Sequence, residues 1–179
     1  GIAASELADA SERRIERMVI AALSNGLTPF LTVEGGVNSG YMIVQYAAAS
    51  MVSENKIYAH PASVDSIPSS ANQEDIVSMG TTAGRKAGMI VKNTLDCLAL
   101  ELMTSCQAID IRRRLNSHGQ GITPLHQAIY NKVREKVAFF EIDREIWPDI
   151  QAVKEMIYSG ELLELIKEYI PDFQSFSPY

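Results

Sequence analysis

The chain has 179 residues, of which 46% are hydrophobic and 21% are charged, a composition typical of one soluble globular unit with its own core. Its formal net charge of −6 and its pI near 5.1 argue against nucleic acid and anionic membranes as partners, because binding to either depends on clustered Lys and Arg. The apolar run over residues 41–52 is too short to cross a bilayer and contains Gln45. We therefore expect a cytoplasmic protein.

The first predicted element is an amphipathic helix over residues 4–23, where apolar side chains recur at helical spacing. Asn25 and Gly26 supply its stop signal. Residues 29–33 are predicted to be extended, and residues 34–40 to form a glycine-rich loop. These glycines match neither the dinucleotide fingerprint nor the P-loop, so a hinge or a close backbone approach is favoured over a phosphate site.

A second helix is expected over about residues 40–58. The small side chains at residues 47–50 offer a smooth surface that a neighbouring helix can approach closely. Such a surface is typical of a helical bundle.

The third predicted helix begins near Gln73 and continues past Ile109 without a proline to interrupt it. Ser70 and Gln73 have the spacing of a capping box. Glu74 and Asp75 fall in the first turn, where carboxylates favour the positive end of the helix dipole.

Nearly every face of residues 95–111 is apolar, so this part of the helix must be surrounded by other helices. A chain of this length offers few companions for so long a buried rod. We therefore expect other chains, or an N-terminal part, to complete the bundle. The arginines at residues 112–114 are interpreted as favourable charges at the C-terminal end of the helix dipole.

Shorter helices are predicted over residues 123–137, 147–160 and 161–170, after a loop at residues 117–121. Alternating strand patterns are nearly absent. The predicted fold class is therefore all-α, a long-helix bundle segment with a C-terminal set of shorter helices.

The domain organisation follows from the same pattern. We expect residues 1–179 to form a single helical unit, with the bundle helices in residues 1–115 and the shorter helices in residues 116–179. No repeat, low-complexity tract or Pro-rich linker divides it.

Few residues form a recognisable catalytic or metal-binding pattern. Cys97 and Cys106 lie on opposite faces of one predicted helix, so they cannot bridge each other and are expected to be buried, reduced thiols. His60, His118 and His126 match no common metal-site spacing, and we assign no metal.

The unusual feature is a polar, proline-containing segment, residues 59–75, between two apolar helices. It includes His60, Ser63 and Asp65, the residue types of a hydrolase triad, but a turn network is the favoured interpretation. The free backbone donors of a helix start can bind a polar ligand group. From spacing alone, an elaborate helix cap is the better prediction.

Eight short strings carry a resemblance to a known family that covers roughly residues 11–150. They are NSGYMI at 38–43, SENK at 53–56, AHPASVDS at 59–66, SANQED at 70–75, VSMG at 77–80, RK at 85–86, ALEL at 99–102 and QAID at 107–110. Together they resemble the histidine ammonia-lyases and the related aromatic amino acid lyases. So long a composite match is more specific than any single short motif.

This resemblance implies a carbon-nitrogen lyase that eliminates ammonia from histidine, phenylalanine or tyrosine. The family's electrophile is a methylidene-imidazolone (MIO) ring made from an Ala-Ser-Gly tripeptide, which does not occur in this sequence. The family's tyrosine base and carboxylate-binding arginine belong to motifs that are also missing here. The resemblance thus implies the last third of an enzyme, inactive alone and completed by its N-terminal part in a homotetramer.

The resemblance assigns substrate recognition to this part. Glu74 matches the family's acidic residue that faces the imidazole of histidine, with Gln73 beside it, and Met42 and Tyr46 match pocket-lining positions. A carboxylate accepts an N–H hydrogen bond from imidazole, whereas a phenyl ring has no such donor. Met42 and Tyr46 can equally be core residues. Ile76 stands where histidine lyases usually have His, and tyrosine-acting relatives favour an aliphatic residue there.

Three functions are therefore weighed. The first is the C-terminal part of a histidine ammonia-lyase, which converts L-histidine to urocanate once completed. The second is a phenylalanine or tyrosine ammonia-lyase or an aminomutase. The third is a non-catalytic helical module that only oligomerises.

Overall fold

The computed structural model describes residues 1–115 and 121–173, so that residues 117–120 of the predicted loop lie outside the described residues. Within these ranges the structure is helical, and β pairing is limited to two isolated bridges. The fold class predicted from the sequence is confirmed. The elements are α1 (Ile2–Val19), η1 (Pro29–Leu31), α2 (Met42–Tyr58), η2 (Ala62–Val64), α3 (Gly80–Arg114), α4 (Pro124–Arg134), α5 (Trp147–Tyr158) and α6 (Glu161–Tyr169).

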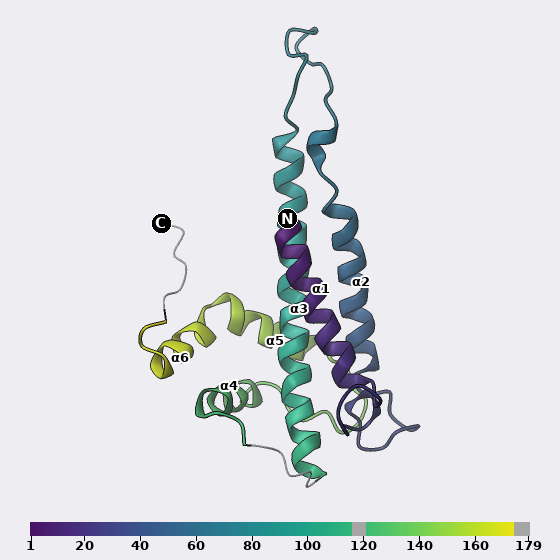
Figure 1. The fold of residues 1–179 in the computed structure, drawn as a ribbon, viewed down its shortest axis with the longest axis vertical. Coiled ribbons are helices and arrows are strands. Elements are labelled where there is room, and N and C mark those ends of the chain that lie inside the picture. The colour runs from purple at the N-terminus through teal and green to yellow at the C-terminus, as the bar shows by residue number, and fades with distance from the viewer. Residues whose placement is uncertain (116–120, 174–179) are drawn as a thin grey trace.

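Helices α1, α2 and α3 run side by side along the long axis of the molecule (Figure 1). The core lies between them, where Ile15 of α1, Ala48 of α2 and Leu100 of α3 are buried. The small residues of α2 permit the close approach that the sequence predicts, since the Cys97 thiol of α3 lies 3.9 Å from the Ala48 carbonyl oxygen.

The shorter helices cover one side of the lower half of α3 (Figure 1). Met156 and Val153 of α5 are buried in the same core as α3. Helix α4 is held to α3 by the Asp110 carboxylate, which accepts hydrogen bonds from the Tyr130 hydroxyl and the Arg134 guanidinium. Helix α5 thus extends the core, and α4 is fixed to α3 by polar contacts.

The predicted start of the third helix at Gln73 is wrong, because α3 begins at Gly80. Ser70, Ala71 and Asn72 adopt left-handed backbone conformations, with φ of 51°, 56° and 69°. The chain therefore turns back at these residues, and Gln73 N donates to the Ser70 carbonyl oxygen at 3.1 Å in place of a capping box. The polar residues that favour helix caps also favour turns.

Other boundaries shift by smaller amounts. Helix α1 ends at Val19 rather than residue 23, and α4 ends at Arg134 rather than residue 137. The stretch predicted to be extended at residues 29–33 contains the 3-10 turn η1 instead. Pro29 presets the first turn of η1, and burial of Leu31 holds it against the core.

The apolar middle of α3 is only partly enclosed by this chain. Cys97, Met103 and Cys106 are buried, whereas Leu98 and Leu102 are half-buried. The prediction that further protein completes the bundle stays a prediction. Among the described helices none is both long and apolar enough to span a membrane.

Candidate functional site

Residues 65–79, called the arm below, form a hairpin that projects past the end of α2 and the start of α3 (Figure 1). Ser69 and Glu74 pair as an antiparallel bridge near its tip. Ser69 N donates to the Glu74 carbonyl oxygen at 2.9 Å, and Glu74 N donates to the Ser69 carbonyl oxygen at 3.3 Å. Nearer the base, Val77 N donates to the Ser66 hydroxyl oxygen at 2.9 Å. The arm is thus closed by its own hydrogen bonds.

The predicted substrate residues Gln73 and Glu74 lie together at the tip of the arm, and both are exposed. The Glu74 carboxylate accepts a hydrogen bond from the Ser69 hydroxyl, with 3.0 Å between Oγ and Oε2. Ile67 and Ile76 of the arm are also exposed, Ile76 to 89%. The arm therefore presents a carboxylate together with apolar side chains that this chain leaves uncovered.

Met42 and Tyr46 lie at the opposite end of α2 from the arm. Met42 is half-buried and Tyr46 is 64% exposed. Tyr46 and the last residue of α2, Tyr58, are twelve residues apart, which is about 18 Å along a helix axis. A single chain does not bring Met42 and Tyr46 to Glu74, so a pocket containing all three would need more than one chain.

A polar cluster at the C-terminal end of α2 was not predicted from the sequence. Asn93 of α3 donates to the Glu54 carboxylate at 2.7 Å and to the Asn55 side-chain oxygen at 3.0 Å. The Tyr58 hydroxyl donates to the other Glu54 oxygen at 2.9 Å. The hydrogen bonds from Asn93 and Tyr58 lower the pKa of Glu54, and the bond to Glu54 raises the pKa of Tyr58. The cluster ties the last turns of α2 to α3.

The triad residue types do not assemble into a triad. Among the described residues no hydrogen bond joins the side chains of His60, Ser63 and Asp65. The Asp65 carboxylate accepts from the backbone N–H of Ser66, and Lys86 donates to the His60 carbonyl oxygen. The segment behaves as the turn network that the sequence predicts.

The glycine-rich loop is held by Asp143 from the far part of the chain. Its carboxylate accepts hydrogen bonds from Ser39 N at 2.7 Å and Gly40 N at 2.9 Å, and Asp143 N donates to the Asn38 side-chain oxygen at 3.0 Å. Gly40 has a φ of +56°, and a Cβ there would lie 2.6 Å from the Phe30 carbonyl oxygen. The predicted close backbone approach is confirmed, and the amides that a phosphate would need are occupied.

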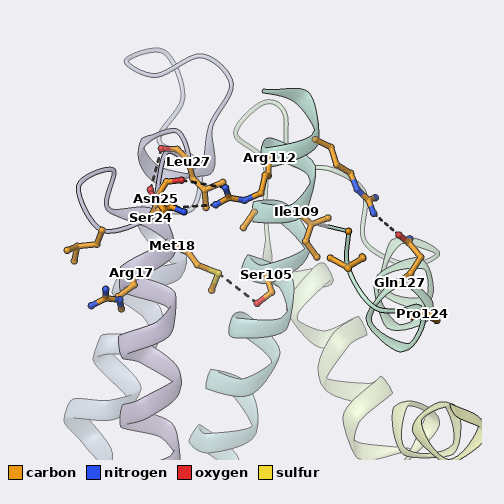
Figure 2. Close-up of a pocket in the computed structure, with 15 residues that line it drawn as sticks. Arg17, Met18, Ser24, Asn25, Leu27, Ser105, Ile109, Arg112, Pro124 and Gln127 are labelled. Carbon is orange, nitrogen blue, oxygen red and sulfur yellow. Dashed lines mark hydrogen bonds between the residues drawn. The ribbon is translucent and has the colours of Figure 1, made fainter. Parts of the chain in front are cut away.

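A cavity of about 920 Å³ opens between the C-terminal ends of α1 and α3 and the start of α4 (Figure 2). Met18 and Ile109 form part of its lining, beside Arg17. Arg112 donates to the carbonyl oxygens of Ser24 and Asn25 at 3.4 and 3.5 Å. The residues around this cavity do not include any of the four predicted substrate residues. It is therefore separate from the arm.

Among the described residues no group of His, Cys, Asp and Glu could hold a metal ion.

Comparison with known proteins then defines the family. The family described as aromatic amino acid lyase matches residues 1–135. The chain belongs to the aromatic amino acid lyase family.

Members of this family resemble the chain along nearly all of its length. A histidine ammonia-lyase from Caldanaerobacter subterraneus subsp. tengcongensis is 56% identical over 167 residues, covering 93% of this chain and 32% of that protein. The crystal structure of histidine ammonia-lyase from Trypanosoma cruzi superposes with a TM-score of 0.85 at 40% identity, covering 97% of this chain and 35% of that one.

A tyrosine aminomutase from Streptomyces globisporus also superposes with a TM-score of 0.85, at 35% identity over 93% of this chain and 31% of that one. The chain therefore spans about a third of the length of the relatives it matches. The family and the fold are shared with enzymes of more than one substrate.

Proposed function

We propose that this chain is the C-terminal part of a histidine ammonia-lyase and that the complete enzyme converts L-histidine to urocanate and ammonia. The observation that carries the proposal is the 56% identity to a histidine ammonia-lyase over 93% of the chain. Because the chain corresponds to about a third of that relative, it needs an N-terminal part for activity and is inactive alone.

The family's MIO ring does not come from this chain. Its sequence contains no Ala-Ser-Gly tripeptide: its Ala-Ser strings lack the glycine, and Asn38-Ser39-Gly40 lacks the alanine. The amides of Ser39 and Gly40 are already bound to Asp143. We propose that the N-terminal part of the enzyme supplies the electrophile and that this chain contributes to substrate binding.

Glu74 is proposed to bind the imidazole ring of the substrate, with Gln73 beside it. The carboxylate would accept an N–H hydrogen bond from imidazole and favour the imidazolium form. In the single chain Glu74 is exposed on the arm, where water weakens such a bond. Covering the arm with another chain would remove water and strengthen it.

The assembly is proposed to be a homotetramer whose active sites combine residues from several subunits. Two features of this chain support a shared site. The arm presents exposed Ile67 and Ile76 beside Glu74, and Met42 and Tyr46 lie too far along α2 to reach Glu74 of the same chain. In the tetramer, Met42 and Tyr46 of one subunit would line a pocket that Glu74 of another completes.

We also propose the partners and the compartment of the enzyme. The partners are the N-terminal part of the enzyme, further copies of the chain and a small amino acid, with no nucleic acid or membrane. The free, buried thiols of Cys97 and Cys106 fit a reducing compartment such as the cytoplasm.

A phenylalanine or tyrosine lyase, or an aminomutase, is the second candidate. It is favoured by Ile76, an aliphatic residue next to the Glu74-Asp75 pair, and by the likeness to the tyrosine aminomutase. A carboxylate facing a phenyl ring would have no donor to satisfy it. Glu74 therefore favours histidine over phenylalanine.

Two measurements test the proposed function. Intact mass and size-exclusion analysis of the source protein should find an upstream polypeptide, with a dehydrated tripeptide, eluting together with this chain. The assembled enzyme should then release urocanate from histidine, followed by absorbance, and be much slower on phenylalanine and tyrosine. A protein containing only 179-residue chains, without lyase activity, would favour the oligomerisation module instead.

A further inference from the structure

The side chain of Glu74 is held by a neighbour across the arm. Ser69 and Glu74 exchange both backbone hydrogen bonds, at 2.9 and 3.3 Å. The Ser69 hydroxyl donates to Glu74 Oε2 at 3.0 Å. Residues directly opposite in an antiparallel pair place their side chains on the same face, so the backbone pairing itself brings the hydroxyl to the carboxylate.

This bond uses only one of the two carboxylate oxygens. Among the described residues, Oε1 of Glu74 has no hydrogen-bond partner. A free glutamate samples several rotamers, and fixing it in one costs conformational entropy at the moment of binding. The Ser69 bond orients the carboxylate in advance and leaves one oxygen available to a ligand.

The tip is closed by a tight turn of its own backbone. Ser70, Ala71 and Asn72 follow one another in the left-handed region, and Gln73 N closes the tip on the Ser70 carbonyl oxygen at 3.1 Å. Below the tip, the Ser66 hydroxyl accepts from Val77 N. Side chains on a fixed backbone orient a binding group better than side chains on a loose loop.

We infer that Ser69 is a positioning residue that orients the Glu74 carboxylate toward the substrate ring. The inference rests on the proposed function, because it gives Ser69 a role only if Glu74 binds substrate. Ser69 itself does not touch the substrate. Its contribution passes through Glu74, whereas a purely structural serine would support the arm whatever residue stands at position 74.

A double-mutant cycle in the complete enzyme separates these roles. Ser69→Ala should lower kcat/KM for histidine about tenfold, the effect of one hydrogen bond to a charged group. In a Glu74→Ala background the same change should have less than about a twofold effect, because the coupled partner is gone. Ser69→Thr, which keeps the hydroxyl, should restore activity, whereas Ser69→Val, of the same size, should not.

Ser66→Ala is the matched control, since it removes a serine bond of the same arm that does not involve Glu74. Its effect should be the same with Glu74 or Ala at position 74. If Glu74→Ala leaves histidine turnover unchanged, the proposed role of Glu74 fails. If Glu74→Ala lowers turnover but Ser69→Ala costs equally in both backgrounds, or Val serves as well as Thr, the positioning role of Ser69 is overturned and the proposed function stands.

Discussion

Gln107 and Phe140 exchange two hydrogen bonds in the buried centre of the molecule. Gln107 Nε2 donates to the Phe140 carbonyl oxygen at 2.9 Å, and Phe140 N donates to Gln107 Oε1 at 3.1 Å. Nε2 also donates to the Leu31 carbonyl oxygen at 3.1 Å. One fully buried amide of α3 therefore satisfies backbone groups of η1 and of the segment between α4 and α5.

Replacing Gln107 with Met, a side chain of similar size, should lower the free energy of unfolding by about 3 kcal/mol, because buried backbone groups of Leu31 and Phe140 would lose their partners. Chemical denaturation monitored by circular dichroism measures this. The exposed Glu155→Met should cost less than about 0.5 kcal/mol. Equal stability of the two variants would contradict the role given to Gln107.

Gly40 should not tolerate a side chain. Gly40→Ala combines a φ of +56° with a Cβ 2.6 Å from the Phe30 carbonyl oxygen, so we expect a loss of about 3 kcal/mol or more, or failure to fold. Gly36→Ala is the control, because Gly36 also has positive φ but faces open space, and should cost only about 1 kcal/mol. Thermal melting compares them, and similar losses would argue against the close approach.

The two thiols should be inert in the folded chain. Burial raises the pKa of Cys97 to about 12 and that of Cys106 to about 11, from an ordinary 9.0. At pH 8 iodoacetamide should modify neither thiol until guanidinium unfolds the protein, as read by mass spectrometry. Rapid modification of the native chain would show that these cysteines are accessible.

The same shifts set a direction for stability against pH. Since the folded pKa values are raised, the stabilisation is fully present below pH 9.0 and is lost as pH rises toward about 11 to 12. The variant with both Cys97→Ala and Cys106→Ala should therefore lose less stability across this range than the unchanged chain, in denaturant titrations at each pH. An equally steep loss would assign the alkaline sensitivity to other groups.

Periodic apolar patterns predicted the helices well. The bounds of α2 and the long run of α3 through Ile109 follow from spacing alone, because these helices bury one or more faces against neighbours. Local sequence could not show that Gln107 is buried and hydrogen-bonded to backbone groups, since its partners Leu31 and Phe140 lie 76 and 33 residues away. The contact of Asp143 with the glycine-rich loop could not be predicted for the same reason, because 104 residues separate Ser39 from Asp143.

The start of α3 was misplaced because Ser70, Gln73 and Glu74 fit a helix cap as well as a turn. Three successive left-handed residues decide for the turn, and none of them is glycine, the residue that would have signalled it. Glu74 was selected by resemblance to a family rather than by any local pattern. Its bond to Ser69 emerged only with the hairpin, which sequence spacing did not predict.

The most direct test of the account is the turnover of histidine by the complete enzyme carrying Glu74→Gln, with Asp75→Asn as the control for loss of a neighbouring charge. If Glu74 binds the imidazole through its charged carboxylate, Glu74→Gln should lower the rate of urocanate formation about a hundredfold, the effect of losing a charged hydrogen bond in a site shielded from water. Asp75→Asn should have a much smaller effect. Unchanged urocanate formation by Glu74→Gln would contradict the account.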